Sequence, residues 1–344
     1  MASMDTFKAD AFSMVSLTAA MNLLPYQPGK LGALGLFSPK PVRTDSIVVE
    51  ERNSKLSLLL TSARGSVANP RSRGARNARN FTIPHVPQFS QIMADDVLNV
   101  RAFGSESELE AVSDLVNSEL VEMRASHEVT QEFHRVKALD GVILDGDGTT
   151  TLVNLYTDFG LTQKEVSFDF GAGTQEMKTK STEIIRNVED GMGGSFFSGV
   201  GVICGNTYWD NFITHASVTT AYERWQDGSM LREQQRMIGG TGGEAPNWFP
   251  YGGLNWMNYR GSIGGTKFVA DLEAFWFPLG TADDTFTEAI APADFVEAVG
   301  TPGQRFYAAQ EMMDFNKGVK LHTQSNTLPI VTRLDAIGKA TDAT

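Results

Sequence analysis

The longest amphipathic pattern in the chain runs from Ser105 to Ala138. Its apolar residues fall mostly three or four positions apart and form one stripe: Leu109, Val112, Leu115, Val116, Leu120, Met123, Phe133 and Val136. Ser105 and Glu108 match the S-x-x-E capping box that begins many helices, and no Pro or Gly interrupts the pattern. The pattern predicts a helix of roughly 34 residues, about 50 Å long at 1.5 Å per residue, that crosses the molecule.

Two pairs of strands are predicted on either side of this helix. Upstream, SIVVEE and KLSLLL flank a turn-like Arg52-Asn53-Ser54, and NFTIPHV alternates Phe81, Ile83 and His85 on one face. Downstream, Gly141–Leu144 and Thr149–Tyr156 flank an Asp-Gly-Asp-Gly turn, which is a favoured hairpin signal. Residues 1–42 are rich in Pro, Gly and apolar residues. Chain of this kind lies against its own body or against a neighbour.

The second half of the chain mixes helices and strands. We expect a helix over Thr174–Glu189, a buried strand over Gly199–Gly205, and one helix over Asn206–Arg224 that is capped by Asn206. The inward residues of this last helix are expected to be Trp209, Phe212, Ile213 and Val218. Strands are predicted in YGGLNWMNYRGS, in FVADLEAFWFPLG, and over Phe306–Gln310, Val319–Thr323 and Leu328–Leu334.

Charge divides the chain into two unequal parts. Residues 52–94 contain seven basic residues and no acidic one, which leaves −19 on the rest because the whole chain carries −12. The long helix, in contrast, has an acidic face. The ordinary interpretation of that face is a solvated surface. The net charge argues against general binding of nucleic acid, which needs a basic footprint.

The basic stretch has several possible partners. Nucleic acid is one, but no aromatic residues interleave the arginines to stack on bases. A solvated loop is a second, and an acidic face on another copy of the protein is a third. A loop of this length can also fold back on its own body, so the residues alone leave these alternatives open.

One motif suggests an enzyme. VILDGDGTT matches the first motif of haloacid-dehalogenase phosphohydrolases, in which Asp145 would be the nucleophile, Asp147 the acid/base and magnesium the cofactor, with Lys267 and Asp283-Asp284 as later motifs. That fold needs a loop and a helix after the strand, whereas Thr149 to Val153 continue as β-formers. We therefore expect no catalytic residue, no metal site and no cofactor. Cys204 and His215 are expected to pack in the core, and no apolar run approaches the 18 residues of a membrane span.

Several stretches, in order, resemble the major capsid protein E family of lambda-like tailed phages. The order is an arm, a strand-flanked basic loop, a long helix and a D-G-D-G hairpin. The most specific stretches are YGGLNWMNYRG, FPLG at Phe277–Gly280, APADFVEAVGTPGQRFYAAQE and QSNTLPIVTRLDAIGKA. The resemblance spans about residues 40–340.

The resemblance implies an α+β protein with the Hong Kong-97-like capsid fold. Its parts would be an N-terminal arm (1–42), an extended E-loop hairpin (43–92), a peripheral domain (93–172) with the spine helix 105–138, a mixed α/β axial domain (173–310), and C-terminal strands (311–344) that return to the peripheral domain. The implied function is the major head protein of a tailed phage. A tail or decoration protein is the nearest alternative.

The family also implies the partners. Copies of the protein would form pentamers and hexamers of an icosahedral shell around double-stranded DNA, which is touched only loosely and non-specifically. Separate scaffold, portal and decoration proteins are expected, with no membrane partner, assembly in the host cytoplasm and a final place in the virion.

This reading yields a hypothesis for the contact between subunits. Basic loop residues of one copy would lie over the acidic spine helix of the next, because a head-to-tail ring joins two different surfaces. The basic members are Arg64, Arg71, Arg73, Arg76 and Arg79, and the acidic members are Glu106, Glu108, Glu110, Asp114, Glu119 and Glu122.

Overall fold

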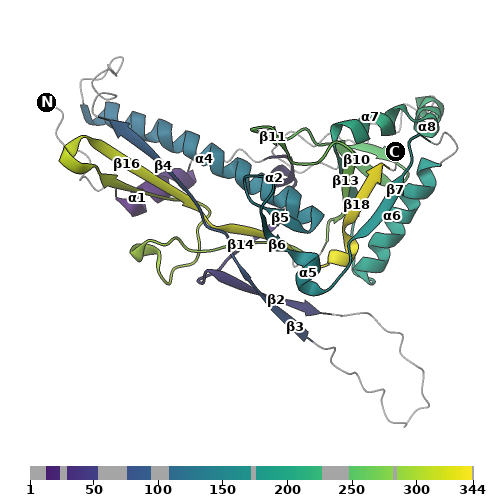
Figure 1. The fold of residues 1–344 in the computed structure, drawn as a ribbon, viewed down its shortest axis with the longest axis horizontal. Helices are drawn as coiled ribbons and strands as arrows, with labels where there is room; N and C mark the ends of the chain where they lie inside the picture. The colour runs from purple at the N-terminus through teal and green to yellow at the C-terminus, as the bar shows by residue number, and fades with distance from the viewer. Residues whose placement is uncertain are drawn as a thin grey trace, which may run out of the picture.

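Figure 1 shows the fold of the computed structural model, which describes residues 13–23, 29–52, 76–93, 108–171, 176–226, 248–281 and 285–342. The α-helices are α1 (Met14–Leu23), α2 (Lys30–Leu34), α4 (Glu108–Asp140), α5 (Leu155–Phe159), α6 (Met177–Met192), α7 (Asn206–Thr214) and α8 (Ala216–Gln226). The single 3-10 turns are η4 (Val296–Ala298), η5 (Asp314–Asn316) and η6 (Leu334–Ala336). In these ranges no helix is long and apolar enough to cross a membrane.

The strands form three larger sheets and three two-stranded pairs. The larger sheets use β1 (Ser38–Pro41), β4 (Val86–Met93), β7 (Lys164–Phe168), β8 (Gly199–Cys204), β9 (Phe249–Tyr251), β10 (Leu254–Asn258), β13 (Glu273–Leu279), β14 (Phe286–Ile290), β15 (Tyr307–Met312), β16 (Gly318–Ser325), β17 (Thr327–Val331) and β18 (Gly338–Asp342). The pairs are β2 (Ser46–Arg52) with β3 (Arg76–Thr82), β5 (Val142–Leu144) with β6 (Thr151–Asn154), and β11 (Ser262–Ile263) with β12 (Thr266–Lys267).

The predicted long helix is confirmed as α4. It does not cross the whole molecule as expected, but crosses one half and ends near the middle, because the six-stranded sheet forms the other half (Figure 1). The described members of its predicted stripe that are fully buried are Val116, Leu120, Met123, Phe133 and Val136. The helix ends at Asp140, two residues beyond the predicted end, because Gly141 takes a left-handed conformation with φ of 78°. Ser105 lies outside the described residues.

A three-stranded antiparallel sheet, in the order β15-β16-β4, packs on the N-terminal half of α4. Its inward residues include Ile92, Val319 and Leu321, which share a core with Leu120 and Met123 of the helix. Burial of a continuous apolar stripe against a sheet is what stabilises a helix of this length, because propensity alone is weak.

A six-stranded mixed sheet, in the order β7-β18-β13-β8-β10-β9, forms the other half of the molecule (Figure 1). The predicted buried strand Gly199–Gly205 is its central strand β8, and the helix predicted over Thr174–Glu189 is found as α6. Its core contains Trp256 and Trp276, both fully buried. Cys204 is also buried here, as expected.

The sheet β1-β14-β17, the β5–β6 hairpin and the base of the β2–β3 pair lie between these halves and surround the main hydrophobic core. The predicted hairpin at Asp-Gly-Asp-Gly is confirmed as β5 and β6, which pair antiparallel. The prediction carries the second strand too far, because Asn154 accepts a hydrogen bond from the Thr157 amide (3.1 Å) and so caps α5 over Leu155–Phe159.

The C-terminal strands are distributed over all three larger sheets. β16 pairs with β15 and β4, β17 pairs with β14, and β18 lies between β7 and β13. Residues 311–344 were expected to return to one domain as a group. Their strands instead lie in three different sheets, and the last strand, β18, belongs to the six-stranded sheet.

The single helix predicted over Asn206–Arg224 is wrong. The chain forms α7 and α8, separated at His215, whose backbone is extended with ψ of 134°. The His215 Nδ1 accepts the Ser217 amide (3.3 Å), and this local cap begins a new helix where the first one ends. Residue Gly205, not Asn206, precedes α7, and Ile213 is 38% exposed instead of inward.

Candidate functional site

The basic stretch enters and leaves the body through the β2–β3 ribbon. One face of the ribbon is anchored in the main core by Ile47, Val49 and Phe81. On the other face, Val48 lies opposite Asn80, and both are exposed. Figure 1 shows the ribbon leaving the body at its lower side, so its described end points away from the core. Alternating burial therefore determines which face of the ribbon packs against the core.

The structure describes one basic side chain of the hypothesised contact, that of Arg79, and it is exposed. Arg64, Arg71 and Arg73 lie outside the described residues, as does the side chain of Arg76, the first residue of β3. The contact itself therefore remains a prediction on the basic side.

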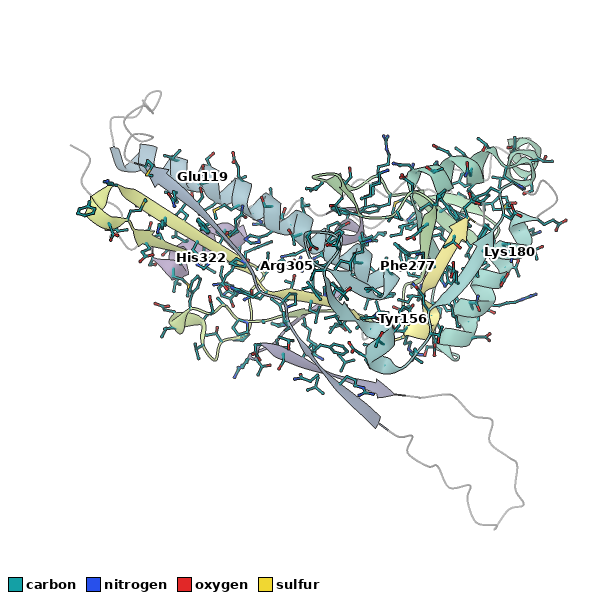
Figure 2. The ribbon with its side chains drawn as sticks, in the orientation of Figure 1. Glu119, Tyr156, Lys180, Phe277, Arg305 and His322 are labelled. Carbon is teal, nitrogen blue, oxygen red and sulfur yellow. The ribbon has the colours of Figure 1, made fainter. Side chains whose placement is uncertain are left out.

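Two acidic side chains of the hypothesised contact are described. Glu122 is exposed, and Glu119 is half-buried and accepts a hydrogen bond from Ser90 Oγ of β4 (2.8 Å). Glu106 lies outside the described residues, and so do the side chains of Glu108, Glu110 and Asp114. Glu119 and the ribbon lie on opposite sides of the molecule in the view of Figures 1 and 2. One subunit does not bring Glu119 and Arg79 together.

The acidic face does not extend along the whole helix. The expectation of a solvated acidic face is wrong for the C-terminal half of α4, where Glu128 and Glu132 are only 6% and 3% exposed. The physical reason is that α2, β14 and the strand β17 surround the C-terminal half of the helix on several sides. A buried carboxylate needs charged or hydrogen-bonding partners, and both residues have them.

Glu132 binds the N-terminal arm. Its carboxylate accepts the amides of Leu31 (2.7 Å) and Gly32 (3.1 Å) at the first turn of α2, and the hydroxyl of Tyr259 (2.8 Å). Burial, and then the charge of Glu132, raise the pKa of Tyr259 far above its usual value, so the phenol stays a donor. A Cβ on Gly29 would lie 2.2 Å from Cδ of Glu132, so glycine is needed for the close approach.

A second buried carboxylate, Glu288 of β14, joins two arginines. Arg135 of α4 donates to it in a bidentate manner, with Nη2 at 2.8 Å from Oε1 and 3.1 Å from Oε2. Arg305, labelled in Figure 2, donates to the same carboxylate at 2.6 Å. Arg135 also lies 3.6 Å from Glu132, so one connected network links α2, α4, β14 and the segment before β15.

Arg124 holds the other arm helix. Its Nε pairs with Glu128 (2.7 Å), its guanidinium lies 4.9 Å from the centre of the Phe306 ring, and Nη1 donates to the Met21 carbonyl of α1. The described parts of the arm therefore lie on the protein's own body. Burial lowers the pKa of His127 and of His134 to about 4, so both are neutral neighbours in this polar interior at neutral pH.

The sequence contained a signal for this network. Arg124 and Glu128 are four residues apart, and Glu132 and Arg135 are three apart, which are the spacings of ion pairs on one helix. His127, Gln131 and His134 lie between them. These spacings suit ion pairs on an exposed helix face equally well, so they indicate the pairs but not their burial.

The Asp-Gly-Asp-Gly turn is held by its own hydrogen bonds. Asp147 accepts the amides of Thr149 (2.8 Å) and Thr150 (2.9 Å) and the Thr150 hydroxyl (2.6 Å). The Thr150 hydroxyl and these amides lower the pKa of Asp147 well below its usual range.

Other parts of the hydrolase motif are not assembled in the described chain. Lys267 pairs with Asp271, and Asp283 and Asp284 lie outside the described residues. The strands around the turn are antiparallel neighbours in a hairpin, not the parallel pair that this enzyme fold needs. Among the residues that the structure describes, no group of three or more His, Cys, Asp or Glu side chains could hold a metal ion.

A long helix on a three-stranded sheet, a separate six-stranded sheet and a projecting ribbon together define the fold of phage capsid proteins. A putative capsid protein of an Escherichia coli CFT073 prophage matches with a TM-score of 0.56 at 13% identity, over 97% of this chain and 100% of that one. The capsid subunit of cyanophage A-1(L) matches with a TM-score of 0.50 at 10% identity, over 93% and 94% of the two chains. The expected Hong Kong-97-like fold is confirmed.

The chain belongs to the family described as phage major capsid protein E, whose model matches residues 13–342. Similar relatives are the major capsid proteins of Pseudomonas phage KPP10 (27% identical, covering 93% of this chain and 94% of the relative) and of Salmonella phage Felix O1 (25% identical, covering 94% of each). The chain is therefore a capsid protein, a structural component of the virion.

Proposed function

We propose that this protein builds an icosahedral phage head by self-association into pentamers and hexamers around double-stranded DNA. The observation that carries the proposal is the family match over residues 13–342. The two major capsid proteins it resembles are matched along nearly their whole length, which supports the same role for the whole chain. Structural neighbours that are capsid subunits support self-association. The proposal includes no catalytic step.

The domain roles follow from the same likeness. We assign the arm to residues 1–42, the E-loop to 43–92, the peripheral domain to 93–172 with residues 311 to about 331, and the axial domain to 173–310. The strand pairing modifies these bounds. β7 and β18 lie in the six-stranded axial sheet, whereas β14 and β15 belong to the other two sheets. Scaffold, portal and decoration proteins are proposed as further partners, and assembly is proposed to occur in the host cytoplasm.

The ribbon is the proposed contact between neighbouring subunits. Support comes from its direction away from the body, from the exposed Arg79, and from the separation between the ribbon and Glu119 within one subunit. Each exposed ion pair is worth only about 0 to 1 kcal/mol, so the pairs matter through repetition around a ring and over a shell. They would set register and assembly rate more than affinity.

Sedimentation and negative-stain microscopy of the purified chain test the proposed function. We expect rings or closed shells whose mass is many times the 37.5 kDa of one subunit. A monomer that persists at every protein and salt concentration, alone and with lysate from infected cells, contradicts the proposal.

Reversing Arg71, Arg73 and Arg76 to Glu tests the ribbon contact. We expect shell yield to fall by about tenfold or more at low ionic strength, and the difference from the native chain to shrink as salt screens the charges. The matched control reverses Lys178, Lys180 and Arg186 on α6, which changes the net charge equally but leaves the ribbon intact. Equal yields from the ribbon variant and the native chain would remove the contact from the proposal, while leaving the shell function untouched.

A further inference from the structure

The outer edge of β15 is covered by a helix instead of a strand. β15 pairs with β16 on one side only, and α1 lies along its other side. Thr18 of α1 is 4% exposed, and its hydroxyl both donates to the Ala308 carbonyl (3.2 Å) and accepts the Ala308 amide (3.1 Å). Both backbone groups of Ala308 therefore point away from β16, and one side chain takes the place of a neighbouring strand.

A second side chain extends this cover. Asn22, one turn further along α1, donates to the Phe306 carbonyl (2.9 Å), the next acceptor on the same edge. Leu17 and Met21 pack into the core with Ile92 and Leu120, which fixes the helix against the sheet. Side chains of α1 thus bond three backbone groups on this edge: the amide and carbonyl of Ala308 and the carbonyl of Phe306.

The cover has little stability of its own. α1 is 10 residues long and contains no charged residue, and isolated helices of that length are marginal in water. It stays in place through Leu17, Met21, Thr18 and the bond from Arg124 to the Met21 carbonyl. α2 is held separately by Glu132, so α1 can leave while the following segment remains bound.

The edge beneath α1 lacks the usual protection against strand pairing. Proteins blunt exposed edges with proline or charge. The other edge strands of the three larger described sheets follow this rule: β1 has Pro39 and Pro41, β4 has Pro87, β9 has Pro250, β17 has Pro329, and β7 has Lys164 and Glu165. β15 contains no proline, and its one charged residue, Glu311, lies near its C-terminal end, so residues 306–310 of this edge, Phe-Tyr-Ala-Ala-Gln, carry neither proline nor charge.

We propose that the outer edge of β15 is a strand-pairing surface for the same edge of a second copy of this chain, and that α1 closes it in the single subunit. An edge recognises another edge through backbone hydrogen bonds. Two copies paired antiparallel about Ala308 place Ala309 opposite Tyr307 and Phe306 opposite Gln310, so no like charges meet. A two-fold pairing of this kind uses the same patch on both partners. α1 thereby prevents an association that would compete with any other assembly of the chain.

Thr18→Val in the full chain tests this proposal, because valine keeps the volume and removes both bonds to Ala308. The measurements are hydrogen exchange at the Ala308 amide and sedimentation, at a concentration below that at which the native chain assembles. We expect exchange at Ala308 to be about tenfold faster, and two-fold dimers that the native chain does not form. Thr182→Val on α6, where the hydroxyl donates only within its own helix, is the matched control.

A second substitution tests the pairing with a second copy separately from the covering of β15 by α1. Adding Ala309→Lys to the Thr18→Val chain places a cation on each edge, and should abolish the dimers while exchange at Ala308 stays fast. Asn22→Leu repeats the test at an exposed position if the Thr18 variant folds poorly. Unchanged exchange at Ala308 overturns α1 as the cover, and fast exchange without dimers overturns the second copy as the partner.

Discussion

Replacing Glu132 with alanine should lower the free energy of unfolding by about 3 to 5 kcal/mol, the cost of breaking a buried ion pair by removing one partner. The carboxylate accepts the amides of Leu31 and Gly32 and the hydroxyl of Tyr259, so the substitution leaves three donors without their acceptor. Two of these donors, the Leu31 amide and the Tyr259 hydroxyl, are fully buried, and the Gly32 amide is half-buried. The substitution also removes one of the two carboxylates beside Arg135. Urea denaturation of the subunit, followed by circular dichroism, measures the change.

Two substitutions calibrate this result. Tyr259→Phe removes one donor to Glu132 and should cost about 1 kcal/mol, the ordinary value of a single hydrogen bond. Glu122→Ala on the exposed side of the same helix should stay within about 0.5 kcal/mol of the native chain. If Glu132→Ala is no more harmful than Glu122→Ala, the carboxylate does not hold the arm on α4.

Gly141→Ala should destabilise the subunit by about 3 kcal/mol or more, because two separate costs add. The residue has φ of 78°, a conformation that costs an L-residue about 1 to 2 kcal/mol. Its new Cβ would also lie 2.2 Å from the ring of Tyr156, a collision that the main core can relieve only by moving that ring. Thermal unfolding with a matched denaturant series measures the loss.

Gly160→Ala supplies the matched control. This glycine also ends a helix in the left-handed conformation, with φ of 68°, but nothing lies within 4 Å of the position of its Cβ. It should show the conformational cost alone, about 1 to 2 kcal/mol. Equal losses at both positions would show that the contact with Tyr156 contributes nothing, and would contradict the packing of α5 under the end of α4.

Local patterns predicted the elements whose stability is decided locally. The stripe from Val116 to Val136 gave the long helix, and Asp-Gly-Asp-Gly gave the β5–β6 hairpin. The alternation predicted for Phe81, Ile83 and His85 is confirmed for Phe81 and Ile83, which are buried. It is wrong for the exposed His85, because β3 ends at Thr82 and β4 begins only at Val86. In each confirmed case a spacing of two, three or four residues already determines which side chains share a face.

The sequence predictions are wrong where a local cap sets the end of an element, or where a partner distant in the sequence sets the burial of a residue. His215 and Asn154 cap new helices, and these caps end one helix and one strand earlier than the apolar pattern predicts. The burial of Glu132 depends on partners far away in the sequence, such as Leu31 and Tyr259. The spacing of acids along a helix does not contain that information.

The candidate contact was only partly accessible to sequence reasoning. The charge contrast predicts a contact between the ribbon and the helix, and this contact stays a prediction. The contrast overestimated the number of exposed acids on α4, where Glu122 is exposed and Glu119 is half-buried and bonded to Ser90. The contact between α1 and the edge of β15 could not be predicted from a sequence motif, because Thr18 and Ala308 are 290 residues apart.

The placement of residues 318–342 has a consequence for biosynthesis. β16 is the central strand of one sheet and β18 lies inside another, so both halves of the molecule await residues that leave the ribosome late. Nascent chains that lack these strands have open sheets and cannot reach the native state, and folding is therefore coupled to the synthesis of residues 318–342. Unfinished polypeptides are excluded from the population of competent building blocks by the topology itself.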